Sequence, residues 1–388
     1  MLICAALGDR KCDILCTDTN ADIDATVACL NALGADIKRT ETGFEVNPII
    51  SLKQNASLNC NESGSTLRFL LPLVASLGAD CSFSMRGRLA QRPLSPLYEL
   101  LCENGVKLSP KGSNPLEVSG RLTFGSYSVA ANVSSQYISG LLFALSIADG
   151  NSTLFLEGNI ESAPYIDMTV DALLSFGADV SYDASAQAFN IKGKKRLHSP
   201  ETLTVGGDWS NAAFFITAGV IGKKPIEVSG LNPSSRQGDR RIIDVLRKMG
   251  ADIVCDKGRV TAIPSKLRGT RIDAADIPDL VPIISVAASV AEGETVIFNA
   301  SRLRLKESDR IESVCSTLST LGATVSATAD GLIIRGKNSL VGGVVDSFND
   351  HRIAMSAAVA SLVCKNAVTV TDFEAINKSY PSFLDNWE

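Results

Sequence analysis

The sequence predicts an α/β protein of two domains, each built from three copies of one repeat. The chain has 388 residues, which is more than a single hydrophobic core normally organises. An apolar segment followed by Gly-Ala-Asp, or a close variant, recurs along the chain with its glycines 71 to 73 residues apart. Polar strings rich in Ser, Asp and Asn come before the apolar segments, as N-caps come before helices. These three observations together favour repeated helix–strand units over an all-α or all-β chain.

The repeated glycine is typical of the left-handed residue that ends a helix, and the alternating stretch after it predicts a short strand. A second series of apolar segments is in phase with the first, and a β-rich stretch such as residues 294–300 follows each of them. One unit therefore predicts helix, strand, helix, strand, strand. Solenoid repeats are usually shorter, at about 20–45 residues, so two globular domains are expected, residues 1–205 and 206–388. The repeated glycines are Gly34, Gly105, Gly177, Gly250 and Gly322.

Composition excludes several classes of function. The formal net charge of −5 argues against general affinity for nucleic acids, and no apolar stretch reaches the length of about 18 residues that a membrane span needs. The 10 cysteines form no C-x-x-C pair and no secretory leader is visible, which predicts a cytoplasmic protein. His198 and His351 are the only histidines, and neither has the spacing of a metal site or a catalytic triad. We therefore expect no metal, and proton chemistry carried by Asp, Glu and Lys.

Cations are unusually frequent at the predicted starts of helices. A helix N-terminus is already positive, so a cation placed there is unfavourable unless an anion binds in front of it. Each polar string taken alone is equally well read as an ordinary N-cap. The set as a whole predicts that several phosphate or carboxylate groups bind where helices begin. The cations are Arg68, Arg92, Lys306, Arg310, Arg352 and Lys378.

Two carboxylates fall near these cations in the repeat. Asp279 and Glu307 are candidates for proton transfer, because a carboxylate beside Lys306 can have a tuned pKa. A plain structural ion pair is the alternative interpretation, and ion pairs are more common than catalytic groups. The sequence contains neither G-x-x-x-x-G-K-[ST] nor a G-x-G-x-x-G that follows a strand, so a nucleotide-dependent enzyme is not indicated.

Eight strings follow one another in order along the whole chain: ESGSTLRFLLPL, AQRPLSPL, VSSQYISGLL, SAPYIDMT, IPDLVPIISVAA, RLKESDRI, FNDHRIAM and NKSYPSF. Together they resemble the ordered motifs of 5-enolpyruvylshikimate-3-phosphate synthases. The resemblance implies an α/β fold of two domains, each with three βαβαββ units related by pseudo-threefold symmetry. It also implies transfer of the enolpyruvyl group of phosphoenolpyruvate to the 5-hydroxyl of shikimate 3-phosphate, with release of phosphate and without a cofactor, by a monomer.

The resemblance also implies roles for individual residues. Asp279 would accept the hydroxyl proton, Lys306 would bind between the substrates, and Glu307 would help to protonate the methylene carbon. Shikimate 3-phosphate would be held by Asp279, Lys306, Ser134, Ser135, Gln136, Ser162 and Tyr165. Phosphoenolpyruvate would be held by Gly64, Arg92, Gln136, Arg310, Arg352 and Lys378.

The sequence departs from the family pattern at two places. Glu62 stands where many members have Asn, and the K-S-x-x-x-R motif of the family is absent, because Met1 leads directly into the apolar run LICAAL. The last unit is also shorter than the period of the other units predicts. From these departures we expect impaired activity.

Two alternative functions remain open. One is a UDP-N-acetylglucosamine enolpyruvyl transferase, which is disfavoured because AQRPLSPL has no Cys beside its Arg. The other is a non-catalytic or fragment-complemented binding protein of the same fold.

Overall fold

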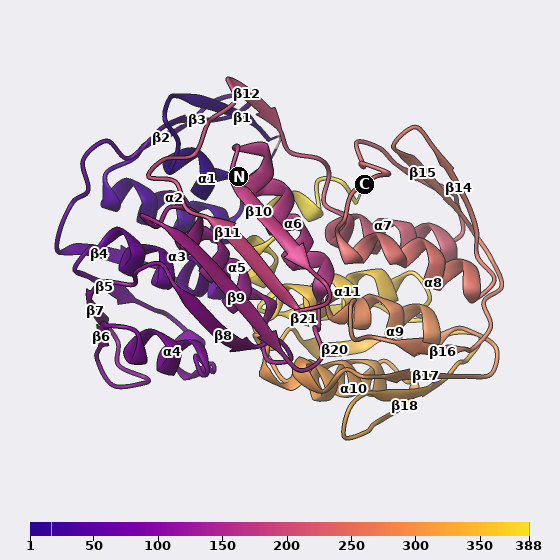
Figure 1. Cartoon of the computed structure of the whole chain (residues 1–388). Coiled ribbons are helices and arrows are strands. Elements are labelled where there is room, and N and C mark those ends of the chain that lie inside the picture. The colour runs from indigo at the N-terminus through magenta and orange to yellow at the C-terminus, as the bar shows by residue number, and fades with distance from the viewer. Residues whose placement is uncertain (17, 388) are drawn as a thin grey trace. The chain divides into compact units, whose positions relative to one another are not determined.

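The computed structural model describes residues 1–16 and 18–387, and it confirms the predicted α/β class (Figure 1). The chain forms two compact units, Met1–Val205 and Gly206–Glu388. The described part of the first unit contains three four-stranded sheets, and that of the second contains a three-stranded, a four-stranded and a two-stranded sheet. Each unit has its own hydrophobic core of helices and inward-facing strand residues.

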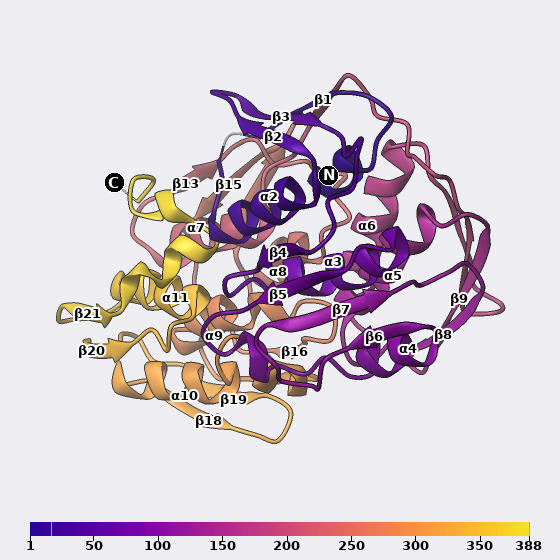
Figure 2. The same cartoon turned by 90° about the vertical axis from the view of Figure 1, so that its left-hand side faces the viewer.

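The sheets of the first unit have the orders β12-β1-β3-β2, β4-β5-β7-β6 and β8-β9-β11-β10. Figure 2 shows the second of these and Figure 1 the third. Most strands alternate buried and less buried residues, because one face packs on the helices and the other meets solvent. Their bounds are β1 Cys12–Leu15, β2 Asp36–Arg39, β3 Gly43–Asn47, β4 Ala56–Asn59, β5 Cys81–Ser84, β6 Val106–Leu108, β7 Leu116–Gly120, β8 Ser126–Ala130, β9 Asn151–Glu157, β10 Asp179–Asp183, β11 Ala188–Lys192 and β12 Thr202–Thr204.

The helices of the first unit are of two kinds. In α3 and α5 nearly every residue is buried, while α2 and α6 bury only one stripe. Their bounds are α1 Leu2–Ala6, α2 Ala21–Leu33, α3 Gly64–Leu77, α4 Leu97–Glu103, α5 Ser135–Ser146 and α6 Ala163–Ser175, with the 3₁₀ helix η1 at Leu89–Gln91.

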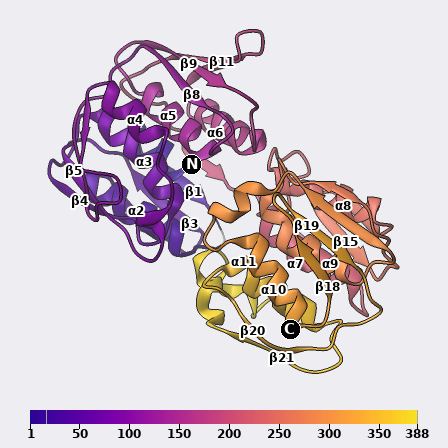
Figure 3. The ribbon, with the colours of Figure 1, turned by 90° about the horizontal axis from the view of Figure 1, so that it is seen from below.

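The second unit repeats this plan. Its strands are β13 Ile226–Val228, β14 Asp252–Asp256, β15 Arg259–Ile263, β16 Arg271–Asp273, β17 Glu294–Phe298, β18 Thr324–Ala327, β19 Leu332–Arg335, β20 Gly343–Asp346 and β21 Val368–Thr371. Its α-helices are α7 Trp209–Ile221, α8 Ile242–Lys248, α9 Val281–Ser289, α10 Arg310–Thr320 and α11 His351–Ser361. Its 3₁₀ helices are η2 Gly238–Arg241, η3 Pro278–Leu280, η4 Ser301–Leu305, η5 Phe373–Lys378 and η6 Pro381–Phe383. Figure 3 shows α7, α9 and α11, which contact one another, side by side.

The repeat has one more strand than the hydrophobic pattern alone predicts. A short strand precedes the buried helix of most units and pairs in parallel with the strand that follows that helix, as β4 pairs with β5 and β16 with β17. The order βαβαββ, which the family resemblance implied, is therefore present. These strands were missed because three to five residues are too few to show a period. One of them, β12, pairs in parallel with β1 from the opposite end of the first unit.

The repeated glycines have the predicted backbone conformation. All five have positive φ, between 68° and 117°. Gly34 ends α2 with φ 117°, and a Cβ there would lie 2.4 Å from the carbonyl oxygen of Ser51. Both the backbone angle and the lack of space therefore require glycine at this turn.

The two most buried helices of the first unit approach closely at Gly140 on α5. A Cβ at this position would lie 2.2 Å from the carbonyl oxygen of Arg68 and 2.9 Å from Cγ of Pro72, both on α3. The absence of a side chain therefore sets the distance between these helices. One turn earlier on α5, Gln136 accepts a hydrogen bond from the Arg68 guanidinium, so the same close approach positions this polar pair.

We expect Gly140→Ala to lower the free energy of unfolding by about 1–3 kcal/mol, because the added methyl group meets a backbone oxygen that cannot turn away. Helix propensity alone would change it by about 1 kcal/mol in the opposite direction, so the sign of the effect decides between the two causes. Urea denaturation measures it. Gly206→Ala is the control, since its new Cβ would meet only Cβ of Asn232, at 3.4 Å. A more stable Gly140→Ala variant would contradict the expectation.

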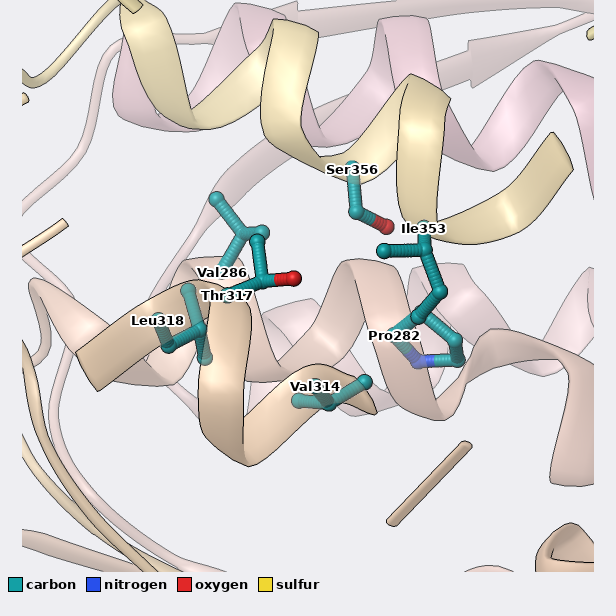
Figure 4. A pocket seen from close by; sticks show the side chains of 7 residues that line it. All are labelled: Pro282, Val286, Val314, Thr317, Leu318, Ile353 and Ser356. Carbon is teal, nitrogen blue, oxygen red and sulfur yellow. The ribbon is translucent and has the colours of Figure 1, made fainter. Parts of the chain in front are cut away.

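A small cavity lies in the core of the second unit, between α9, α10 and α11 (Figure 4). Its volume is about 10 Å³, which is the space that one water molecule needs. The hydroxyl groups of Thr317 and Ser356 point into it, and neither has a hydrogen-bond partner among the described residues. The cavity is too small for an organic substrate. Its lining residues are Pro282, Val286, Val314, Thr317, Leu318, Ile353 and Ser356.

Candidate active site

In the first unit, two guanidinium groups converge on the N-terminus of α3. A Cβ at Gly64, the first residue of α3, would lie 2.7 Å from Nη1 of Arg68 and 3.0 Å from Nη1 of Arg92. Both cations therefore lie against the same glycine, at a helix end whose backbone N–H groups add further positive potential. Like charges are brought together in this way where an anion binds.

Arg68 is held by three groups besides its own helix. Its Nη1 donates to Oε1 of Gln136 at 2.8 Å, its Nη2 donates to the carbonyl of Pro93 at 3.2 Å, and its guanidinium carbon lies 5.8 Å from the centre of the Tyr137 ring. Tyr137 also donates to Pro93, at 2.7 Å. Gln136 is thereby tied to the arginine pair. Arg68 was recognised in the sequence as a cation at a helix start but was not given a role at the site, and Tyr137 was missed because a buried tyrosine in an apolar run is typical of a core residue.

The serines predicted to bind a phosphate surround the starts of α5 and α6. Ser134 caps α5 by accepting from the backbone N–H of Gln136, and Ser135 is its buried first residue. Ser162 precedes α6, is buried, and has φ 55°, a left-handed conformation that costs energy for a residue with a Cβ. Tyr165 lies in the first turn of α6 and its N–H donates to the carbonyl of Ser162. The two helices are joined by the Ser139–Thr169 hydroxyl pair at 2.7 Å.

In the second unit, an Asp279 carboxylate is surrounded by three cations. Its Oδ1 lies 2.8 Å from Nη1 of Arg310 and 3.3 Å from Nζ of Lys306, and its Oδ2 lies 3.5 Å from Nη2 of Arg352. Arg352 Nη1 also donates to the backbone carbonyl of Asp279 at 3.2 Å and to Ser210 at 2.6 Å. The three cations come from the segment after η4, from α10 and from α11, so three separate parts of the chain converge on this carboxylate of η3.

Arg310 is the centre of this cluster. Its side chain is 1% exposed and donates to three carboxylates: Nη1 to Asp279 at 2.8 Å, Nη2 to Glu307 at 2.8 Å, and Nε to Asp350 at 2.7 Å. Burial opposes its charge, but the three carboxylates outweigh burial and raise the pKa of Arg310 above its usual range. Together with Lys306 and Arg352, Arg310 and its three carboxylates form one network of six formal charges, three of each sign.

The pKa values of the carboxylates follow from the same balance. Burial disfavours the charged form of Asp279, but the attraction of Arg352, Lys306 and Arg310 outweighs it and holds the pKa of Asp279 well below its usual range. The pKa of Asp350 is likewise lowered, by Arg310 against the effect of burial. His351 is buried, which lowers the pKa of its imidazole to about 4 and leaves it neutral at pH 7.

The predicted position of cations at helix starts is only partly right. Arg310 and Arg352 are the first and second residues of α10 and α11, and Arg68 is in the second turn of α3. Lys378 instead ends the 3₁₀ helix η5, where its Nζ donates to the carbonyl of Asn349 at 2.7 Å. Arg92 and Lys306 follow η1 and η4. These segments form short 3₁₀ helices, which the apolar pattern does not distinguish from the starts of α-helices.

Comparison with known proteins decides the family. The family model for EPSP synthase (3-phosphoshikimate 1-carboxyvinyltransferase) matches residues 1–387. The chain belongs to the EPSP synthase family. It is 39% identical over 398 residues to the 3-phosphoshikimate 1-carboxyvinyltransferase of Clostridium novyi, covering 100% of this chain and 91% of that protein. It is 41% identical to the enzyme of the same name from Clostridium acetobutylicum, covering 98% and 90%.

A solved structure supports the same assignment. EPSP synthase from Acinetobacter baumannii is similar to the chain with a TM-score of 0.81 and 25% sequence identity, over 99% of this chain and 91% of that one. The predicted two-domain EPSP synthase fold and transferase class are therefore confirmed, and the UDP-N-acetylglucosamine alternative is not favoured. Among the described residues, no helix has the length and apolarity that a membrane span requires, and no cluster of three or more His, Cys, Asp or Glu could hold a metal ion.

Proposed function

We propose that this EPSP synthase family member transfers the enolpyruvyl group of phosphoenolpyruvate to the 5-hydroxyl of shikimate 3-phosphate. The observation that carries the proposal is the Asp279 carboxylate, 16% exposed, among Lys306, Arg310 and Arg352. Such a cluster can bind an anionic substrate through its cations and accept a proton through its carboxylate. The curated relatives, which carry the name of this transferase, support the choice of substrates.

In the proposed reaction, the 5-hydroxyl oxygen of shikimate 3-phosphate forms a bond to C2 of phosphoenolpyruvate, and Asp279 takes the proton that this hydroxyl loses. Glu307, in its protonated form, gives a proton to the methylene carbon, with Lys306 between the substrates, and a tetrahedral intermediate results. The bond from C2 to the phosphate oxygen then breaks, and phosphate leaves with the proton that Asp279 had taken. The former methylene carbon returns one proton to Glu307, and the double bond is regenerated. Atoms and charges balance without an oxidant or reductant.

Substrate binding also tunes the proton acceptor. In the ligand-free chain the pKa of Asp279 is held well below its usual range by three cations, which makes it a weak base. A phosphate or carboxylate group bound to Arg310 and Arg352 offsets part of the attraction that these two cations exert on Asp279. The pKa of Asp279 then rises toward the value that proton transfer needs. Anion binding and base strength are coupled through Arg310 and Arg352, which take part in both.

The first unit supplies the remaining proposed contacts. Gly64, Arg92 and Gln136 are proposed to hold phosphoenolpyruvate, with Arg68 added because it lies against the same glycine. Ser134, Ser135, Gln136, Ser162 and Tyr165 are proposed to hold shikimate 3-phosphate. Hydroxyl and N–H groups at the starts of α5 and α6 are suited to a sugar-like phosphate ester.

The test is release of inorganic phosphate from phosphoenolpyruvate with shikimate 3-phosphate as acceptor. UDP-N-acetylglucosamine, offered in parallel at the same concentration, distinguishes the sister reaction. Saturable release that needs shikimate 3-phosphate supports the proposal. The proposal would be overturned if phosphate were released only with UDP-N-acetylglucosamine. It would also be overturned if calorimetry showed that neither acceptor binds.

Gly64→Ala is expected to raise KM for phosphoenolpyruvate about 10-fold or more and to change KM for shikimate 3-phosphate little. The added methyl group would lie 2.7 Å and 3.0 Å from the guanidinium nitrogens of Arg68 and Arg92, which must move from the anion site. A shift of about 1.4 kcal/mol in binding corresponds to a factor of ten. Steady-state kinetics with each substrate varied measures both constants, and Gly206→Ala again serves as the control. Equal KM values in wild type and Gly64→Ala would remove this glycine from the site.

A further inference from the structure

Asp350 is a fully buried carboxylate that contacts Arg310 of the cationic cluster and has no role in the reaction proposed above. Its side chain is 0% exposed, and it precedes the first residue of α11. It belongs to the string FNDHR, in which an aspartate before a helix is well explained by N-capping alone. Capping accounts for only one of the four hydrogen bonds that this carboxylate accepts in the described part of the chain.

Three of those contacts are made with the segment that carries the proposed proton donor. Asp350 Oδ2 accepts from Nε of Arg310 at 2.7 Å and from the hydroxyl of Ser308 at 3.1 Å, and Oδ1 accepts from Nη2 of Arg310 at 3.2 Å. The Nε and Nη2 edge of the guanidinium is thus bound by both oxygens of one carboxylate. Two hydrogen bonds of this kind fix the plane of a guanidinium as well as its position.

The fixed plane determines where the rest of Arg310 points. With one edge held by Asp350, Nη1 is directed to Asp279 at 2.8 Å and Nη2 also reaches Glu307 at 2.8 Å. These are the two carboxylates that the proposed function uses as proton acceptor and proton donor. The fourth contact of Asp350 runs to the backbone N–H of Arg352 at 3.0 Å, and α11 therefore begins at a defined place relative to Arg310.

We propose that Asp350 is a positioning residue that orients Arg310 toward Asp279 and Glu307 and sets the start of the helix that carries Arg352. The inference rests on the proposed function for its substrates, but its geometric part concerns Arg310 alone. The charged and titratable groups around Asp350 are Arg310 and Glu307 from the facing segment, Asp279 beyond Arg310, and His351 and Arg352 on its own helix. Among the described residues of this group, only Arg310 donates side-chain hydrogen bonds to the Asp350 carboxylate, whereas Arg352 donates its backbone N–H.

Asp350→Asn separates positioning from capping. Asparagine caps helices as well as aspartate does, so a residue that only starts α11 would leave the kinetics unchanged. An asparagine, however, has only one oxygen and presents an NH₂ group toward the guanidinium. We expect kcat/KM for phosphoenolpyruvate to fall at least 10-fold, with KM for shikimate 3-phosphate within about 2-fold of the wild-type value.

The matched control is Asp309→Asn. Asp309 caps the neighbouring helix α10 and also pairs with an arginine, since its Oδ1 accepts from Glu312 N–H and its Oδ2 lies 2.9 Å from Arg304. It is 34% exposed and contacts none of the proposed catalytic groups through its side chain. Wild-type kinetics are expected for this variant, as for any exposed cap of similar chemistry.

A double-mutant cycle shows whether Asp350 acts through Arg310. The effects of Asp350→Asn and Arg310→Lys on kcat/KM should be strongly non-additive, because lysine cannot make the two-point contact that Asp350 orients. Ser308→Ala supplies a second and milder variant should Asp350→Asn fold poorly, and a loss of about 2- to 5-fold is expected from it. Additive effects in the cycle, or wild-type kinetics in both Asp350→Asn and Ser308→Ala, would overturn the inference.

A crystal structure of Asp350→Asn keeps this test independent of turnover. Arg310 is expected to lose its contact with Asp279 or Glu307 while α11 still begins at His351. An unmoved Arg310 would overturn the inference even if the enzyme is active. Absence of turnover in the wild-type chain would count against the proposed function. The crystal structure of Asp350→Asn would still test whether Asp350 orients Arg310.

Discussion

Asp279→Asn is expected to lower kcat for phosphate release by about 10²–10⁴-fold, the usual contribution of a positioned acid or base. The amide keeps the size of the side chain and can still accept a hydrogen bond from Arg310, but it cannot take the hydroxyl proton. KM for shikimate 3-phosphate is expected to change much less than kcat. Steady-state phosphate release with each substrate varied separates the two constants.

Asp276→Asn is the matched control for this variant. Asp276 lies three residues upstream in the same segment and is also paired with an arginine, Arg241, at 3.2 Å. Its side chain is 39% exposed, whereas that of Asp279 is 16% exposed among three cations. The control is expected to have wild-type kcat. If Asp279→Asn also had wild-type kcat, another group would have to accept the proton, and the proposed mechanism would be wrong.

The pH dependence of the wild type follows from the same carboxylate. Because the pKa of Asp279 is lowered in the folded chain, its charged form is present from well below pH 4 upward in the absence of substrates. Bound anions raise this pKa, so the acidic limb of kcat is expected at higher pH than the titration of Asp279 in the free protein. The difference between the two curves measures how strongly substrate charge and base strength are coupled.

The architecture was largely predictable because it repeats. A glycine that returns every 71 to 73 residues at the end of a helix can be recognised without knowledge of what the helix packs against, and all five such glycines have the expected left-handed φ. The short strands before the buried helices were not predictable in this way. Their identity depends on parallel pairing with a strand about twenty-five residues later, as β4 pairs with β5, and three to five residues carry no periodic signal of their own.

The candidate site divides along a similar line. Cations at the starts of helices were visible because they contradict the helix dipole, and Arg310 and Arg352 are indeed at those positions. Asp350 was hidden because its one sequence signal, an aspartate before a helix, is fully explained by capping. That it also binds Arg310 depends on the packing of α10 beside α11, two helices about forty residues apart in the chain. A local pattern cannot report such a contact.

Arg310→Met is expected to lower the free energy of unfolding by about 3–5 kcal/mol at pH 7.5, because it leaves buried carboxylates without their shared cation. Asp350 is the most affected, since its side chain is 0% exposed and Arg310 is the main attraction that keeps its pKa low. Methionine has a similar length and fills the space, so the loss reports charge rather than a cavity. Urea denaturation at a series of pH values measures it.

The pH series gives this prediction its sign. In the wild type the pKa of Asp350 is lower in the folded chain than in the unfolded chain, so its stabilising effect is present above the unfolded value of about 3.9 and is lost as pH falls through the folded value. In Arg310→Met, burial without Arg310 raises that pKa above the unfolded value. The same carboxylate then destabilises the protein at neutral pH and ceases to do so once it is protonated in the folded state. The gap between the two proteins should therefore be widest near neutral pH and narrow as pH falls toward 4.

Arg335→Met is the control, because Arg335 also pairs with a carboxylate, Glu294 at 3.0 Å, but with 72% of its side chain exposed. Solvent screens such a pair, and a loss below about 1 kcal/mol is expected, with little dependence on pH in this range. A loss of this size for Arg310→Met as well, or a gap that does not narrow at low pH, would show that the cluster around Arg310 is hydrated like a surface pair. The orientation of Arg310 by Asp350 would then lose its physical basis, since only a desolvated carboxylate holds a guanidinium strongly enough to fix its plane.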